Sequence, residues 1–182
     1  MECLLLLLFI ASNTLPCTDA TEDFPLAMLA NDLLANYSKE VLPVVNWQSS
    51  LTVHLNISIT SILNLDEKNY RLSMYILFTQ GWYDYHLQWD PVKYDGITHI
   101  SLPTNEVWYP DLIIDEMVSK QEPSRPPFIL VNASGWVDNS KPLLISSTCS
   151  GKMQSFPFDE HVCSLSFRSA LHTSEPLTIR FE

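Results

Sequence analysis

The chain has 182 residues, enough for one domain with a hydrophobic core of ordinary size or for two very small domains. Its formal net charge is −11, which argues against nucleic-acid binding and suits a cationic ligand, although a surface kept acidic for solubility is an equally good interpretation. No apolar run after residue 20 reaches the roughly 20 residues that a membrane-spanning helix needs, so we do not expect the chain to form a channel by itself.

Residues 1–20 are predicted to be a secretory signal peptide. Leu4 to Ile10 form an unbroken apolar run that is too short to cross a membrane, and small and polar residues follow it up to Ala20. Cleavage after Ala20 leaves residues 21–182 as the extracellular domain. Sequons for N-linked glycosylation agree with export, and they begin at Asn36, Asn56 and Asn132.

Cleavage also removes Cys3 and Cys17 and leaves Cys149 and Cys163. An even number of cysteines in an exported chain favours a disulfide over a metal site or a reactive thiol. A bond between Cys149 and Cys163 would close a loop of about 15 residues, which is worth roughly 3 kcal/mol in the chain-entropy model.

The mature chain begins with a predicted helix and continues with strands. From Phe24 to about Ser38, apolar residues recur at the spacing of one amphipathic helix. Residues 51–60 then alternate between apolar and polar, which predicts a half-buried strand whose polar face, including Asn56, is in water.

Turns are predicted at residues 66–69 and 132–135. Further strands are predicted at residues 70–78, 97–102, 128–131, 135–137, 143–148, 162–167 and 177–181. Short strands punctuated by Pro, Asn and Asp indicate an all-β sandwich with one N-terminal helix.

Three motifs follow one another along the chain. The first is Trp82-x-Asp84-x-x-Leu87-x-Trp89, the second is Trp108-x-Pro110-Asp111, and the third is the run from Phe156 to Asp159 between the two cysteines. That run, Phe156-Pro157-Phe158-Asp159, gives the loop an apolar tip, which suits a loop that docks onto another surface; the alternative is that both phenylalanines fold back into the core.

Together these motifs resemble the Cys-loop, or pentameric ligand-gated ion channel, family. Within that family, residues 62–69 and 171–173 most resemble the serotonin-gated type 3 receptor subunits. The resemblance implies an immunoglobulin-like β-sandwich with an N-terminal α-helix, without a cofactor. It also implies a protomer of a homo- or hetero-pentamer that binds a small cationic transmitter such as serotonin between neighbouring subunits.

The positions that match the family's ligand-binding residues lack much of its aromatic character. Such aromatic faces hold an ammonium group by cation–π attraction, worth up to about 2 kcal/mol per desolvated contact. The resemblance places tryptophan where this chain has Leu77 and Ala170, arginine at Thr79, tyrosine at Leu130 and Ser140, and an aromatic residue at Met117. The other matching positions are Asp115, Glu116 and Ser169.

We therefore expect an accessory or divergent subunit, which forms no competent serotonin site with copies of itself. Glu116 is interpreted as an exposed carboxylate, and an ion pair in water contributes at most about 1 kcal/mol, too little to replace several aromatic contacts.

The resemblance also assigns structural and coupling roles. Large aromatics are more often packing anchors than ligand contacts, and carboxylates at turns usually accept backbone hydrogen bonds. The residues expected to be structural are Trp82, Asp84, Trp89, Trp108, Pro110 and Asp111. The residues that match the segments coupling ligand binding to the pore are Glu67, Lys68, Phe156, Pro157, Phe158 and Asp159.

Two other classes of function remain as alternatives. A secreted ligand-binding or decoy protein and a truncated isoform both fit a chain without a membrane segment; we favour truncation because the chain stops inside the predicted last strand. A full-length form would lie on the extracellular face of the plasma membrane. An enzyme is disfavoured, because the five histidines lack metal-ligand spacing and no nucleophile motif accompanies Asp159-Glu160-His161.

Overall fold

The computed structural model describes residues 24–121, 128–152, 160–171 and 176–182. The predicted signal peptide, residues 1–20, and the loop-tip residues Phe156, Pro157, Phe158 and Asp159 lie outside the described residues. Among the described residues, none of the helices has the length and apolar character needed to cross a membrane.

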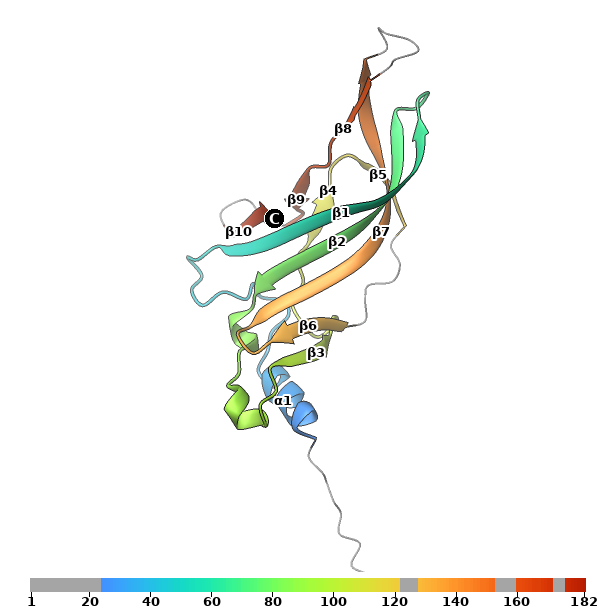
Figure 1. The fold of residues 1–182 in the computed structure, drawn as a ribbon. Helices are drawn as coiled ribbons and strands as arrows, with labels where there is room; N and C mark the ends of the chain where they lie inside the picture. The colour runs from blue at the N-terminus through green and yellow to red at the C-terminus, as the bar shows by residue number, and fades with distance from the viewer. Residues whose placement is uncertain (1–23, 122–127, 153–159, 172–175) are drawn as a thin grey trace, which may run out of the picture.

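In the described ranges, one helix is followed by ten strands and two short 3₁₀ helices. Figure 1 shows how they are arranged. The elements are α1 (Pro25–Leu34), β1 (Leu51–Asp66), β2 (Arg71–Tyr83), η1 (Tyr85–Leu87), η2 (Pro91–Tyr94), β3 (His99–Pro103), β4 (Leu112–Ile114), β5 (Met117–Gln121), β6 (Phe128–Asn132), β7 (Trp136–Lys152), β8 (Glu160–Cys163), β9 (Phe167–Ser169) and β10 (Leu177–Phe181). The all-β sandwich with an N-terminal helix is therefore confirmed.

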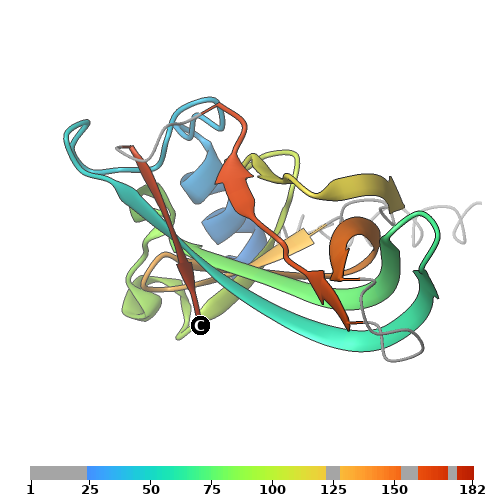
Figure 2. The same cartoon turned by 90° about the horizontal axis from the view of Figure 1, so that it is seen from above.

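The strands form a large sheet and a small one. The large sheet has the order β10-β1-β2-β7-β6-β3, and β5 and β8 also pair with β7. Strands β1 and β10 are parallel, whereas the other pairs are antiparallel. The small sheet consists of β4 and β9. Seen from above, the orange-red β9 and the blue helix α1 lie on the same side of the green and teal β1–β2 ribbons (Figure 2).

The core forms between the two layers because the strands bury alternate residues. In β1 the side chains of Leu51, Val53 and Leu55 are buried, as the predicted period of two requires. The Trp82 ring from β2 is fully buried and lies edge-to-face against Trp108. Aromatic pairs of this geometry add about 0.5–1.5 kcal/mol to the effect of burial.

Helix α1 ends at Leu34, four residues earlier than expected. The segment after it does not continue the helix, because Tyr37 forms hydrogen bonds with residues that are distant in sequence. The Tyr37 hydroxyl donates to Asp84 Oδ2 at 2.5 Å and accepts from the Trp108 backbone N at 3.1 Å. These bonds tie the chain after the helix to the end of β2 and to the segment before β4.

The strand boundaries differ from the predicted ones in three places. Strand β7 is continuous where two strands were predicted, since Pro142 lies between the residues that pair with β6 and those that pair with β5. Proline has no backbone N–H, and this is tolerated in a strand where the side facing away from its paired neighbour has no partner strand. The predicted strand at 162–167 is two strands, because β8 pairs with β7 and β9 pairs with β4. Strands β4 and β5 were not predicted.

The turn predicted at residues 132–135 closes the β6–β7 hairpin. Asn132 Oδ1 accepts from the backbone N of Ser134 and of Trp136, each at 3.0 Å. Gly135 has a φ of 83°, and a Cβ at this position would lie 2.5 Å from the Asp84 carbonyl oxygen. Both the left-handed backbone and the close approach require glycine here.

Two candidate ligand-binding surfaces

The first group of predicted ligand residues meets around the small sheet and is called the β4–β9 surface: Asp115, Glu116, Met117, Ser169 and Ala170. The pairing of Leu112 with Ser169 and of Ile114 with Phe167 sets the register. This register brings the turn after β4 beside the start of β9 and leaves Ala170 just beyond its end. The structure therefore places five residues from two distant stretches of sequence on one small sheet, with Asp115, Glu116 and Met117 at one end and Ser169 and Ala170 at the other.

Asp111 fixes the end of β9. Its carboxylate accepts from Ser169 Oγ at 2.8 and 2.9 Å and from the Leu171 backbone N at 2.6 Å. Its carbonyl oxygen also accepts from the Ala170 N at 3.0 Å. The backbone at Ala170 is thus held on both sides, while its methyl side chain is exposed.

Glu116 fixes the other end of the same surface. Its carboxylate accepts from the Ser166 backbone N and from Ser166 Oγ, both at 2.6 Å. Both hydrogen bonds lower the pKa of Glu116, and the bond from the Ser166 side chain has the larger effect. The Glu116 carboxylate lies at an exposed site but is not free, because both of its oxygens already accept hydrogen bonds from Ser166. Asp115 likewise accepts from Arg168 Nε at 2.6 Å.

The second group lies on the large sheet and is called the outer sheet surface: Leu77, Thr79, Leu130 and Ser140. Thr79 is paired with Ser140 across β2 and β7, and their hydroxyls are 2.9 Å apart. Leu77 is 42% exposed and Leu130 is 46% exposed, so this surface presents aliphatic and hydroxyl side chains to solvent.

The outer sheet surface lies on the side of the large sheet that faces away from the small sheet. The Phe78 ring stacks on Phe167 of β9 with centroids 5.7 Å apart, so Phe78 points to the inner face of the sheet. Its neighbours Leu77 and Thr79 point to the outer face, since successive strand residues alternate. A site that uses both surfaces therefore needs two copies of such a domain.

An aromatic cluster on the outer face was not foreseen from the sequence. The Trp136 ring lies 4.9 Å from Tyr83 and 5.3 Å from His54, centroid to centroid. Gly81 makes this possible, because a Cβ there would be 2.3 Å from Trp136 Cζ2. The alternation of β1 already put His54 on the polar face, but nothing in the sequence pairs it with Trp136.

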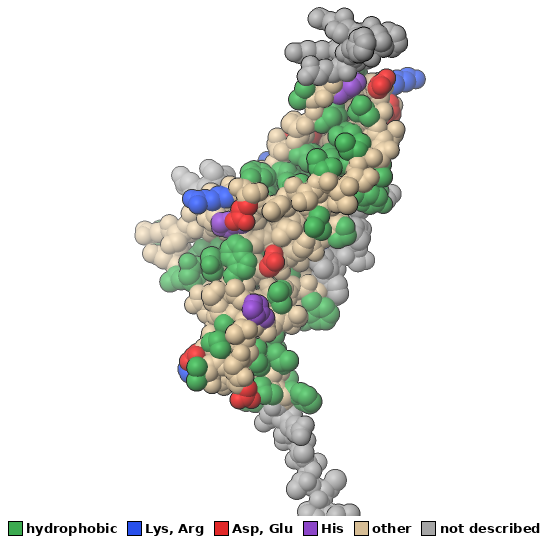
Figure 3. Space-filling model, in the orientation of Figure 1, with side chains coloured by type: hydrophobic (Ala, Val, Ile, Leu, Met, Phe, Trp, Pro, Cys, Tyr) green, Lys and Arg blue, Asp and Glu red, His purple; other side chains and the backbone are tan. Residues whose placement is uncertain are grey.

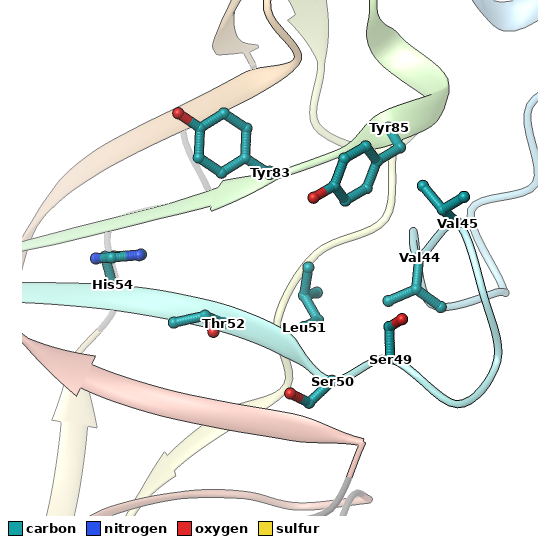
Figure 4. Close-up of a pocket in the computed structure, with 9 residues that line it drawn as sticks. All are labelled: Val44, Val45, Ser49, Ser50, Leu51, Thr52, His54, Tyr83 and Tyr85. Carbon is teal, nitrogen blue, oxygen red and sulfur yellow. The ribbon is translucent and has the colours of Figure 1, made fainter.

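A hollow of about 230 Å³ opens beside this cluster, at the start of β1 (Figure 4). Tyr83 and Tyr85 border it on one side, and the loop carrying Val44 and Val45 borders it on the other. None of the predicted ligand residues lines it.

The residues expected to be structural are placed as follows. Trp82, Pro110 and Trp108 are buried, and the half-buried Trp89 donates from Nε1 to the Ile97 carbonyl oxygen at 2.7 Å. Asp84 is 1% exposed and also accepts from the His86 backbone N at 2.9 Å. Burial raises the pKa of Asp84.

The remaining predicted residues that the structure describes are exposed or half-buried. Glu67 and Lys68 are exposed in the β1–β2 turn, and the structure contains the disulfide between Cys149 and Cys163 that joins β7 to β8. Among the predicted glycosylation sites, Asn36 and Asn56 are exposed and Asn132 is half-buried.

A family model for the neurotransmitter-gated ion-channel ligand binding domain matches residues 26–182. The chain belongs to this family of ligand-binding domains, and the match confirms both the resemblance drawn from the motifs and the expectation that the chain is not an enzyme. In the present structure this domain contains the disulfide between β7 and β8 and the two surfaces described above.

Among its relatives are serotonin receptor subunits. The chain is 42% identical over 154 residues to the mouse 5-hydroxytryptamine receptor 3A, which covers 85% of this chain and 32% of the relative. It is 39% identical over 164 residues to the human 5-hydroxytryptamine receptor 3B, covering 90% and 37%. The human neuronal acetylcholine receptor subunit alpha-10 is 34% identical over 153 residues, covering 84% and 34%. The chain thus spans about a third of the length of these relatives.

Proposed function

We propose that this chain is the extracellular part of an accessory or divergent serotonin-type receptor subunit. It assembles with other subunits of the family in a pentamer at the plasma membrane, and it forms no competent serotonin site with copies of itself. The observation that carries the proposal is the separation of the two surfaces, since the outer sheet surface faces away from the small sheet and each surface is then available to a different neighbour.

The chemistry of both surfaces supports a weakened site for an ammonium ligand. The outer sheet surface offers Leu77, Thr79 and Leu130, none of which has an aromatic face. On the β4–β9 surface, Ala170 is exposed without an aromatic ring. Each missing cation–π contact removes about 0.5–2 kcal/mol, so the loss of three lowers affinity by orders of magnitude.

The carboxylates do not offset this loss. Glu116 is bonded to Ser166 and Asp115 to Arg168, so a cation that approaches this surface competes with bonds the protein already makes. Exposed ion pairs contribute at most about 1 kcal/mol. A transmitter site would therefore depend on aromatic residues from a partner subunit.

The coupling role belongs to the end of the domain that carries the β1–β2 turn. Glu67 and Lys68 are exposed there, and Ile62 and Leu63 in the same hairpin are exposed apolar residues. Figure 3 shows hydrophobic side chains along this end of the domain. Exposed apolar side chains of this kind suit contact with a further module. The tip residues Phe156 to Asp159, which match the family's coupling loop, are proposed to act with this turn.

A chimaeric receptor tests the proposal. Residues 24–182 replace the matching segment of a serotonin type 3A subunit, and the chimaera is expressed in cells alone or with the unchanged subunit. We expect no serotonin current from the chimaera alone, and co-purification and surface delivery with the unchanged subunit. A current at micromolar serotonin from the chimaera alone, or a failure to co-purify, contradicts the proposal.

A matched gain of function uses the same chimaera. The substitutions Ala170→Trp, Leu77→Trp and Leu130→Tyr together restore aromatic faces on both surfaces. Serotonin binding is expected to appear in this triple variant. As a control, the isosteric change Leu130→Met leaves binding undetectable.

A further inference from the structure

The outer face of the large sheet has a gap at Gly81. In the strand register His54 of β1 is opposite Gly81, and Gly81 is opposite Asp138 of β7. His54 and Asp138 therefore lie in one row on the same face, with a residue that has no side chain between them. Neighbouring strands are about 4.8 Å apart, so the backbones of β1 and β7 are about 10 Å apart across this gap.

The gap forms a depression of about 240 Å³, called here the Gly81 depression. The Trp136 ring lies over Gly81 and supplies an aromatic wall, and its edge-to-face contacts with Tyr83 and His54 hold it there. Since one molecule of liquid water takes up about 30 Å³, the depression has room for the polar end of a long side chain.

Two carboxylates, Asp138 and Glu182, also line the Gly81 depression. Glu182 Oε1 is bonded to His54 Nδ1 at 2.7 Å. The Asp138 side chain is exposed, and within the described part of the chain its carboxylate has no hydrogen-bond or ion-pair partner. It differs in this respect from Asp115, which already accepts from an arginine. The Asp138 carboxylate is therefore available to a cation from outside the chain.

An aromatic ring beside a free carboxylate suits a guanidinium group. This planar cation stacks on an aromatic ring by cation–π attraction, and its N–H groups donate in a fork to a carboxylate. Trp136 and Asp138 stand two residues apart on the same face of β7, so one guanidinium can contact both.

We propose that the Gly81 depression receives a basic side chain, an arginine above all, from the neighbouring subunit of the pentamer. The inference rests on the proposed function for the existence of that neighbour, and it adds the chemistry that the neighbour must present. In a single chain the depression is open to solvent, so a free cation is held only weakly. A neighbour that covers the depression excludes water, and this strengthens both the cation–π contact and the ion pair.

The charges also favour a neighbour of a different sequence. Two copies of this chain, each with a formal net charge of −11, repel one another. Arg168, the basic residue in β9, already donates from Nε to Asp115 Oδ1 at 2.6 Å. A different subunit with an unpaired arginine on its facing surface complements Asp138, which gives a physical reason for assembly with other subunits.

Photolabelling of the purified chain tests the cation site. The probe is n-butylguanidinium bearing a diazirine, and the matched neutral probe is the corresponding n-butylurea. Mass spectrometry is expected to find the guanidinium label at Trp136 or Asp138, several-fold more than the urea label. Equal labelling by the two probes overturns the inference.

The variant Asp138→Asn keeps the shape of the side chain and removes its charge. It should lower the guanidinium labelling several-fold. Asp95→Asn is the control, because Asp95 is an exposed carboxylate outside the depression and Asn tolerates its left-handed backbone. Labelling that is equal in D138N and D95N contradicts the role of Asp138.

The co-purified pentamer shows where the cation comes from. The chimaera that carries residues 24–182 is assembled with the unchanged serotonin type 3A subunit and exposed to the same guanidinium probe. Labelling of Trp136 is expected to fall several-fold, because a neighbour's side chain fills the depression, and D138N should lower the co-purified fraction several-fold relative to D95N. Unchanged labelling would make the depression a site for a free cation, and an unchanged co-purified fraction would mean that no basic side chain of the neighbour anchors there; either result overturns the assignment to a neighbour.

The two experiments separate this inference from the proposed function. A chimaera that fails to co-purify with the type 3A subunit refutes the proposed function and leaves the labelling of the purified chain standing. A purified chain without charge-dependent labelling refutes only the Gly81 depression as a cation site.

Discussion

Replacing Tyr37 by Phe removes one hydroxyl from the junction between the N-terminal segment, β2 and the segment that leads to Asp111. The Asp84 carboxylate loses the donor at 2.5 Å, and the Trp108 backbone N loses its acceptor at 3.1 Å. Both burial and the Asp84 charge raise the pKa of Tyr37, which keeps the hydroxyl protonated as the donor. Each buried group left without its partner costs about 1–3 kcal/mol, so we expect Y37F to lower the free energy of unfolding by about 3 kcal/mol.

Urea unfolding of the purified chain, followed by tryptophan fluorescence, measures this change. Tyr94→Phe is the matched control, because the Tyr94 hydroxyl also donates to a carboxylate, Asp32 Oδ2 at 2.9 Å, but at an exposed site. The control is expected to unfold at the same urea concentration as the natural chain. A Y37F midpoint equal to that of Y94F would show that the junction contributes nothing to stability.

Three further predictions concern single side chains. Burial raises the pKa of Asp84. The contribution of the Asp84 carboxyl group to stability is therefore present below the unfolded pKa of 3.8 and is lost as the pH rises through the higher folded pKa. Asp84→Asn should remove this decline from a pH series of unfolding curves. Hydrogen bonds from Ser166 lower the pKa of Glu116. The stability that these bonds contribute is therefore present above the unfolded pKa of 4.5 and is lost as the pH falls through the lower folded pKa. The amide resonance of Ser166 should shift as the pH falls through the folded pKa, and Glu116→Gln should abolish this shift. Gly81→Ala forces Trp136 out of place and should cost about 1–3 kcal/mol in the same urea assay, whereas an unchanged midpoint would mean that the ring does not lie over Gly81.

The sequence predicts those elements whose pattern is local. Strand β10 is found at its predicted residues, and β1 begins at the predicted Leu51, because burial of one face imposes a period of two. The end of α1 was missed, since the hydroxyl of Tyr37 bonds to Asp84 and Trp108, which are distant in sequence. Tertiary contacts override the apolar spacing there.

The candidate site was predictable in its residues but not in its bonds. The family motifs point to Asp115, Glu116 and Ala170, and the structure places Asp115 and Glu116 at one end of the β4–β9 pair and Ala170 at the other. No pattern in the sequence reveals that Ser166 donates hydrogen bonds to the Glu116 carboxylate, because this contact depends on the pairing of β4 with β9. The same holds for Trp136 over Gly81, a contact set by the register of β2 and β7.

Isothermal titration of serotonin into the purified chain tests the central claim most directly, since it measures binding by copies of this protein alone. We predict no saturable heat of binding at micromolar serotonin, because neither surface presents aromatic faces at the matching positions. A dissociation constant in the micromolar range or tighter would contradict the account.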